Sequence, residues 1–313
     1  MCRLGQTGLQ VSRLAFGAGP VPALMTGTEG GQRRAVVRRA LDAGINWFDT
    51  AAGYGDGQSE LNLGTTLSEL GARDAVHLAT KVRLAGDDFL APERAIRESL
   101  ARSLQRLGVE RVTLLQLHNA VTVGRGDLAA SVSVDDVLRQ GGVADVFARL
   151  RDEGRIGWCG LTGTGDAESL RSVVASGRFH TIQAPYNLVN PSAGQPLDED
   201  FRETNYRQLF AVCQQYDVGV LAIRVLAGGA LAGQPPSPHT YRTPYFPLDL
   251  YHRDQERAAV LAEFWRHRGL SLKEAAVRFV LAHPAVTAAI IGFSAPEQVD
   301  ELCEYADRGP LPA

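Results

Sequence analysis

The chain repeatedly alternates short runs of apolar and β-branched residues with longer segments of helical periodicity, and this alternation constrains its fold more than any other feature. The run His77–Val82, for example, precedes a segment that Pro92 opens as a helix and Gly108 ends. Roughly eight such units follow one another without a break in composition. Strands that alternate with helices pair in parallel through right-handed crossovers, and eight units favour a closed barrel over an open doubly wound sheet. We therefore predict an α/β fold, a (β/α)8 TIM barrel with an N-terminal β-hairpin at residues 4–11.

The expected strands cover residues 13–16, 46–50, 77–82, 112–118, 156–161, 181–186, 218–225 and 287–291. The expected helices cover residues 32–43, 60–70, 92–107, 143–151, 168–176, 208–216, 256–268, 272–282 and 296–305. A barrel of this kind takes about 250 residues or more in one domain, so we expect residues 1–313 to form a single domain.

Two expected connections are too long to be simple turns, at residues 119–142 and 226–254. Long connections that follow barrel strands usually carry function at the mouth of the barrel. The second is rich in proline and has aromatic residues that we expect to cover a ligand, with packing on the barrel rim as the alternative. These residues are Tyr241, Tyr245, Phe246 and Tyr251.

Polar residues are few at the carboxyl ends of the expected strands, where barrel enzymes place their active sites. Asp49 ends the second strand, and Tyr54 lies just beyond it. Lys81 ends the third strand and His118 the fourth. Each residue singly has an ordinary structural explanation, such as a capping aspartate or a solvated lysine. Because neighbouring parallel strands end side by side, we expect the four side chains to face one another across the mouth.

These four side chains together suit acid–base chemistry on a carbonyl group. A phenol is a weak acid near neutral pH, with an ordinary pKa of about 10, and a nearby ammonium group lowers such a pKa. Asp49 would hold the ammonium of Lys81, and a histidine can donate to a carbonyl oxygen on which charge develops. Such a centre lacks a nucleophile–base pair, so it suits hydride addition with protonation of the oxygen, the hydride coming from a cofactor.

Several sequence motifs resemble those of the aldo-keto reductase family, in the family's order and along nearly the whole chain. They are LGQTGLQVSRLAFGAG, NWFDTAAGYGDGQSELNLG, ATKV, LLQLHN, GRIGWCGLTG, QAPYNLVNPSAG and IIGFSAPEQVDE. The resemblance implies a catalytic tetrad of Asp49, Tyr54, Lys81 and His118, with Tyr54 as proton donor. It also implies a nicotinamide-dependent oxidoreductase that acts on an aldehyde, ketone or sugar, or on the corresponding alcohol.

The resemblance further implies that the cofactor binds extended across the barrel mouth, without a Rossmann domain. The nicotinamide end would contact Asp49, Thr162, Gly163 and Gln183, with Ile223 against the ring and Arg224 beside it. The adenosine phosphate end would bind at Gly292, Ser294, Gln298 and Glu301, where the start of the last helix is a natural anion site.

Four features of the sequence that differ from the common family pattern or are unusual bear on the cofactor. Gly163 stands where an asparagine is common, and Ile223 where many members have an aromatic residue that stacks on the nicotinamide. Arg224 is unusual in so apolar a strand, and it would contact cofactor phosphate, substrate or a structural carboxylate. Neither Ser294 nor Gln298 is basic, although many members hold the 2′-phosphate of NADP with a basic residue there. NADP(H) is the expected cofactor and NAD(H) the alternative, which would favour oxidation of a sugar or alcohol.

Two other functions are weighed against the reductase. A nicotinamide-binding regulatory or scaffold protein with little turnover would tolerate Gly163 and Ile223, but it would not need Lys81 beside Tyr54. A metal-dependent barrel hydrolase using Asp49 and His118 is disfavoured, because the seven histidines form no H-x-H pair and we expect no metal. The polar Gln116, Asn119 and Arg224 near the mouth favour a hydroxylated substrate such as a sugar.

The charge balance favours a small-molecule substrate as the partner of this chain. A formal net charge of -3 and a pI of about 6.2 give no reason to expect a nucleic acid or an anionic membrane as partner. The sequence has no long apolar run of the kind that forms a membrane helix or a signal peptide, so we expect a cytoplasmic protein. The four cysteines have no regular spacing and are expected to be reduced thiols.

Overall fold

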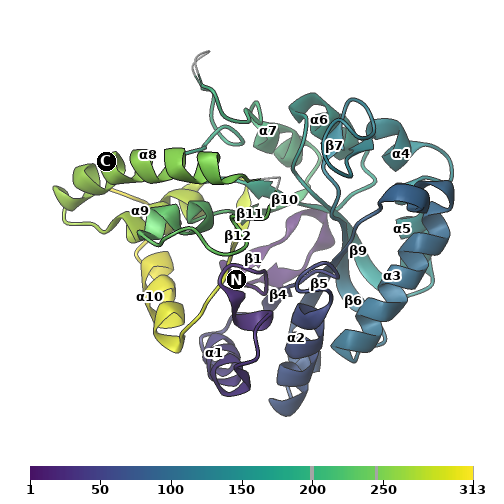
Figure 1. The fold of residues 1–313 in the computed structure, drawn as a ribbon, viewed down its shortest axis with the longest axis horizontal. Coiled ribbons are helices and arrows are strands. Elements are labelled where there is room, and N and C mark those ends of the chain that lie inside the picture. The colour runs from purple at the N-terminus through teal and green to yellow at the C-terminus, as the bar shows by residue number, and fades with distance from the viewer. Residues whose placement is uncertain (198–200, 244–245, 313) are drawn as a thin grey trace.

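The computed structural model describes residues 1–197, 201–243 and 246–312. In this part of the chain, eight parallel strands close into a barrel, which confirms the predicted TIM barrel (Figure 1). The barrel strands, in chain order, are β3 (Leu14–Gly17), β4 (Trp47–Asp49), β5 (His77–Val82), β6 (Val112–Leu117), β9 (Ile156–Thr162), β10 (Thr181–Pro185), β11 (Gly219–Ile223) and β12 (Val286–Ile291). Pairing of β12 with β3 closes the barrel, with Ala289 opposite Leu14.

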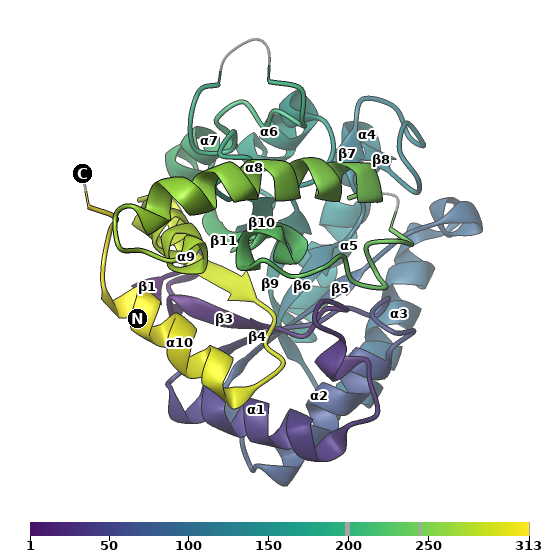
Figure 2. The same cartoon turned by 60° about the vertical axis from the view of Figure 1, so that its left-hand side comes forward.

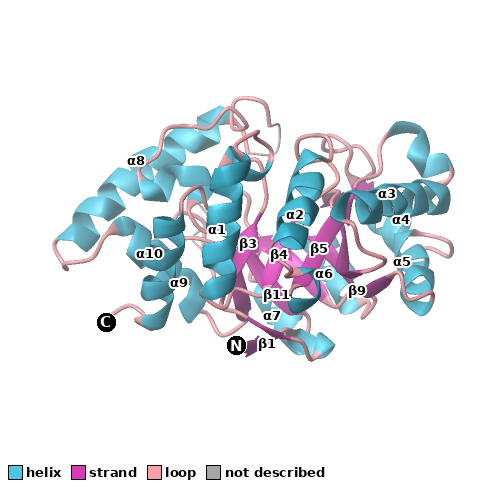
Figure 3. Ribbon diagram, turned by 90° about the horizontal axis from the view of Figure 1, so that it is seen from below, coloured by secondary structure: helices cyan, strands magenta, loops and turns pink. Residues whose placement is uncertain are grey.

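Helices surround the strands on the outside of the barrel (Figure 3). They are α1 (Gly30–Asp42), α2 (Gln58–Glu69), α3 (Pro92–Leu107), α4 (Val134–Leu138), α5 (Val143–Asp152), α6 (Ala167–Ala175), α7 (Leu209–Gln215), α8 (Leu248–Arg266), α9 (Leu272–Ala282) and α10 (Pro296–Asp307). None of the helices in the described ranges is long and apolar enough to cross a membrane.

Local sequence signals explain why α3 has the bounds that it has. Pro92 occupies the first helical position, and Gly108 ends the helix in a left-handed conformation with φ 67°. Between them, Ile96, Leu100 and Leu104 recur every four residues and are buried on one face. This face packs against the outside of the barrel, within the large apolar layer between strands and helices.

A second, smaller apolar cluster fills the inside of the barrel and is covered at one end by the N-terminal hairpin. Its buried members are Leu4, Val11, Ala15, Trp47, Ala79, Leu114, Leu221 and Ala288. The predicted hairpin consists of β1 (Cys2–Arg3) and β2 (Gln10–Val11), paired antiparallel. The backbones of Gly5 and Gly219 approach so closely that a Cβ on Gly5 would lie 2.3 Å from the Gly219 nitrogen. Arg3 of the hairpin also forms an ion pair with Asp217 at 2.9 Å. The hairpin therefore closes the barrel at the end where the strands begin.

The two long connections at the other end both contain regular structure. Within residues 119–142, β7 (Val121–Thr122) and β8 (Val132–Ser133) form a short parallel pair that leads into α4. In the second connection, α8 begins at Leu248, so the last residues of the expected segment 226–254 are helical. This helix lies beside α9, outside the strands (Figure 2).

The aromatic residues of the second connection have different environments. Phe246 lines a cavity and stacks on Arg224. Tyr251 instead packs in a small apolar cluster and donates its hydroxyl to the Gln234 carbonyl at 2.7 Å, and Tyr241 is 61% exposed. Tyr245 lies outside the described residues.

Candidate active site

The strand register brings the four predicted acid–base residues to one end of the barrel. Asp49 is the last residue of β4, and Tyr54 follows in the turn before α2. Lys81 is the next-to-last residue of β5 and pairs in register with Gln116 of β6, while His118 comes directly after β6. The predicted convergence of Asp49, Tyr54, Lys81 and His118 is thus present in the structure.

Lys81 is the central group of this arrangement. Its side chain and that of Asp49 form a close ion pair, with residue exposures of 2% and 3%. The ammonium also donates to the Thr50 carbonyl at 2.9 Å and lies 3.5 Å from the Tyr54 hydroxyl. Burial by itself lowers the pKa of Lys81, but the Asp49 carboxylate and the Tyr54 hydroxyl outweigh it, so the pKa is raised. The ammonium is therefore fixed in its charged form against the tyrosine oxygen.

His118 lies on the other side of Tyr54. The two rings meet edge to face, with their centroids 5.6 Å apart. Burial lowers the pKa of His118 well below its ordinary value, and the positive charges of Lys81 and Arg83 lower it further. A neutral imidazole has one N–H donor and one acceptor nitrogen, so His118 is suited to hydrogen bonding rather than to carrying charge.

Two glutamine amides complete the surroundings of Asp49. Gln116 donates to one carboxylate oxygen at 3.0 Å, and Gln183 of β10 donates to the same oxygen. Gly160 of β9 allows this approach, because a Cβ there would lie 2.5 Å from the Thr181 hydroxyl and 3.0 Å from Gln116. Sequence reasoning placed Gln116 on the substrate side and missed this contact with Asp49. The signal was available in the sequence, since Gln116 is a polar side chain among the apolar residues Leu114, Leu115 and Leu117.

A cavity of about 630 Å³ opens above these residues, within the size range of small-molecule sites. Asp49, Tyr54, Lys81 and His118 all line it, together with Arg83, His239 and Arg242 on the rim. Thr162, Gln183, Ile223 and Gly292, four of the residues expected at the cofactor, line the same cavity. Among the described residues, no group of three His, Cys, Asp or Glu side chains is arranged to hold a metal ion.

The residues expected at the nicotinamide have contacts that bear on this role. Thr162 is paired with Gln183 in register, and its buried hydroxyl has no hydrogen-bond partner within residues 1–197, 201–243 and 246–312. Gly163 packs tightly, because a Cβ there would lie 2.8 Å from the Ile182 side chain. The glycine in place of the family's asparagine thus has a packing reason.

The residues expected at the adenosine end are only partly brought to the cavity. Gly292 lines it, at a position where a Cβ would lie 2.5 Å from the Val21 carbonyl oxygen. The Ser294 amide and hydroxyl donate to the Gln298 side chain at 2.8 and 3.1 Å, at the start of α10. Glu301 is further along this helix and pairs with Lys273 at 2.7 Å. Ser294, Gln298 and Glu301 do not line the cavity in the described part of the chain.

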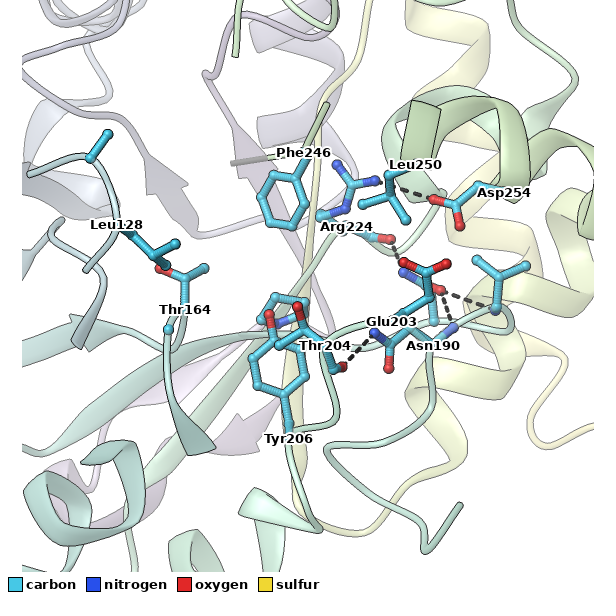
Figure 4. Close-up of a pocket in the computed structure, with 15 residues that line it drawn as sticks. Leu128, Thr164, Asn190, Glu203, Thr204, Tyr206, Arg224, Phe246, Leu250 and Asp254 are labelled. Carbon is cyan, nitrogen blue, oxygen red and sulfur yellow. Dashed lines mark hydrogen bonds and ion pairs between the residues drawn. The ribbon is translucent and has the colours of Figure 1, made fainter. Parts of the chain in front are cut away.

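Arg224 has a structural carboxylate as its partner, one of the three alternatives drawn from the sequence. Its guanidinium lies 3.4 Å from Asp254 of α8 and stacks on Phe246, 3.9 Å from the ring centroid. Burial lowers the pKa of Arg224 and raises that of Asp254 to about 6. Arg224 also borders a second, smaller cavity beside the first (Figure 4).

Comparison with known proteins agrees with this fold. A model of the Aldo/keto reductase family matches residues 13–313. D-threo-aldose 1-dehydrogenase of Pseudomonas sp is 28% identical, covering 96% of this chain and 90% of that protein. A putative voltage-gated potassium channel subunit beta of Schizosaccharomyces pombe is also 28% identical, covering 97% of this chain and 88% of that protein.

The fold is also that of an aldo-keto reductase from Klebsiella pneumoniae, solved in complex with NADPH. The TM-score is 0.70 at 21% identity, covering 100% of this chain and 90% of that chain. The chain is therefore an oxidoreductase built on a TIM barrel. It belongs to the aldo-keto reductase family.

Proposed function

We propose that this protein transfers hydride between a nicotinamide cofactor and a carbonyl or alcohol group, with Tyr54 as the proton donor. The observation that carries the proposal is the position of the buried Lys81 ammonium, between the Asp49 carboxylate and the Tyr54 hydroxyl at 3.5 Å. A buried ammonium beside a phenol stabilises the phenolate that remains when the proton leaves. A protein that only bound the cofactor would have no need of this pair.

The residues of the cavity fit a nicotinamide. The buried Thr162 hydroxyl without a partner in the described residues, with Gln183 beside it, offers hydrogen bonding to a carboxamide. When bound, the cofactor supplies or accepts the hydride. NADPH in the Klebsiella relative supports NADP(H) as the cofactor. NAD(H) is the alternative, because Gln298 at the start of α10 is engaged with Ser294, and Lys273 of α9 is paired with Glu301 further along α10.

The chain's own residues account for the proton step. Tyr54 gives its hydroxyl proton to the carbonyl oxygen as negative charge develops there, and Lys81 stabilises the tyrosine oxygen left behind. Asp49 keeps the ammonium in position and is itself held by the two glutamine amides. His118, neutral because burial lowers its pKa, presents an N–H to the same carbonyl oxygen.

The test is Tyr54→Phe, which removes the proton and keeps the ring. Turnover of a carbonyl substrate should fall by roughly 10²- to 10⁴-fold, the usual contribution of general acid catalysis, while NADPH still quenches tryptophan fluorescence as in the wild type. Tyr216→Phe is the matched control, because Tyr216 directly follows α7 and does not line the cavity. Full turnover by Tyr54→Phe would contradict the assignment of the proton donor.

A nicotinamide-binding regulatory or scaffold protein is the second candidate, favoured by the similarity to the channel subunit and by Ile223 at the ring position. It predicts cofactor binding by the wild type with no cofactor oxidation across a broad screen of aldehydes, ketones and sugars. Turnover of any of these by the wild type, lost in Tyr54→Phe, supports the reductase instead.

A further inference from the structure

A side cavity of about 200 Å³, whose lining residues Figure 4 shows, shares part of its lining with the active-site cavity. The shared residues are Thr164, Arg224 and Phe246. The side cavity is built by several connections at the mouth of the barrel, with Leu128 from the first long connection and Leu250 from α8. At about 30 Å³ per water molecule in the liquid, it has room for roughly seven waters, or for a hydroxylated chain of a few carbons.

The side chain of Arg224 is held in place at this shared wall, but not all of its guanidinium N–H groups are used in hydrogen bonds. Its backbone has φ 56°, in the left-handed region, and its carbonyl accepts from the Asn187 amide at 2.9 Å. One guanidinium nitrogen contacts Asp254, while Phe246 covers the flat face. The other two nitrogens have no hydrogen-bond acceptor among the described residues. Side-chain donors fixed by packing, yet unpaired beside a cavity, are suited to a ligand.

Tyr206 provides a second donor inside the side cavity. The residue is 3% exposed, its ring points into the cavity, and its hydroxyl has no hydrogen-bond partner in the described part of the chain (Figure 4). Burial raises the pKa of Tyr206, so the hydroxyl keeps its proton at physiological pH. Because Tyr206 lines the cavity, its hydroxyl is available to donate to a molecule that occupies this space.

The charges around the side cavity are already balanced within the protein. Arg224 faces Asp254, and Glu203 pairs with Arg253 at 2.9 Å and with Arg257 at 3.4 Å. An anionic ligand would meet Asp254 and Glu203 next to Arg224, and a cation would meet Arg224. A neutral ligand with several hydroxyls would bond to Arg224, Tyr206 and the Asp254 carboxylate without disturbing either pairing.

We propose that the side cavity binds the hydroxylated part of the substrate remote from the reacting carbonyl, with Tyr206 and Arg224 as specificity-determining residues. The inference rests on the proposed function, and it restricts the substrates to polyhydroxylated carbonyl compounds of sugar type. Thr164, Arg224 and Phe246 line both cavities, so a substrate that occupied both would lie against these three residues.

The experiment compares Tyr206→Phe with wild type on a short aldehyde, propanal, and a sugar, D-xylose, by NADPH oxidation. Loss of one neutral hydrogen bond should lower kcat/KM for D-xylose by about three- to tenfold and leave that for propanal within a factor of two. Thr164→Val, on the shared wall, should act in the same direction with a smaller effect. Tyr186→Phe is the matched control, because Tyr186 is also a buried tyrosine and lines neither cavity. An equal loss on both substrates, or no loss on either, would overturn the proposal.

Binding of xylitol, the alcohol formed when D-xylose is reduced, needs no turnover and therefore separates this proposal from the proposed function. Saturation-transfer NMR should detect xylitol on the wild type and on Tyr54→Phe, with a weaker signal on Tyr206→Phe than on either. If the wild type turns over no carbonyl compound, the proposed function fails and the xylitol result alone decides the inference. Xylitol binding that is unchanged in Tyr206→Phe, or absent from the wild type, would overturn it.

Discussion

Replacing Lys81 by methionine removes the cation from a buried ion pair and leaves Asp49 charged in the interior. Breaking a buried pair in this way costs about 3–5 kcal/mol of unfolding free energy. Asp49 keeps the two amide donors of Gln116 and Gln183, and a hydrogen bond to a charged group contributes about 1.5–3 kcal/mol. We therefore expect Lys81→Met to lose about 3 kcal/mol, at the lower end of the range, measured by urea unfolding.

The companion variant Asp49→Asn instead leaves the Lys81 ammonium without its carboxylate partner, although the Thr50 carbonyl still accepts from it at 2.9 Å. Its expected loss is again about 3 kcal/mol. The double variant leaves no unpaired charge, so it should lose about 2 kcal/mol less than the sum of the two single losses. Additive losses, or single losses below about 1 kcal/mol, would refute the view that Lys81 and Asp49 stabilise each other in the folded state.

Three further predictions concern packing and protonation. Gly163→Asn should cost about 1–3 kcal/mol in urea unfolding without raising turnover, because the Cβ would lie 2.8 Å from Ile182; unchanged stability would contradict this. The His118 imidazole should remain neutral in NMR titration until well below pH 6.5, because burial lowers its pKa. Since the unfolded chain takes up this proton first, stability should fall as the pH drops below 6.5, and a midpoint at 6.5 or above would be evidence against the argument. Burial raises the pKa of Cys159 to about 11 and of Cys213 to about 12, so neither thiol should react with iodoacetamide at pH 8 before the protein is unfolded in urea; rapid reaction of the native protein would argue against burial.

The fold was predictable where the controlling signals are local. The expected helices 92–107 and 272–282 agree with α3 and α9, which begin at local signals, Pro92 and the Ser271 cap. The start of α8 was expected at residue 256 but lies at Leu248. Its first turns mix two leucines and a tyrosine with charged residues and follow a proline-rich stretch. They are fixed by the burial of Tyr251 and Asp254 against distant parts of the chain. Such tertiary contacts leave no periodic pattern in the sequence.

The same distinction applies to the site. The convergence of Asp49, Lys81 and His118 follows from strand order alone, because neighbouring parallel strands end side by side. The partner of Arg224 could not be chosen from the sequence, since Asp254 lies on a helix that follows a long connection. The side cavity depends on the same contact, and for this reason only the structure reveals it.

The hairpin that covers the base of the barrel also affects the order in which the chain can fold. Arg3 and Gly5 contact residues around Asp217, and Leu14 pairs with Ala289, so the N-terminal segment packs on parts of the chain that come much later in the sequence. During synthesis the N-terminal segment leaves the ribosome long before its partners exist. Its apolar residues Leu4 and Val11 therefore remain exposed to solvent until Leu221 and Ala288, which bury them in the native fold, have been synthesised. Closure of the barrel is then a late, long-range event, and the nascent chain is most prone to aggregation in the interval before it.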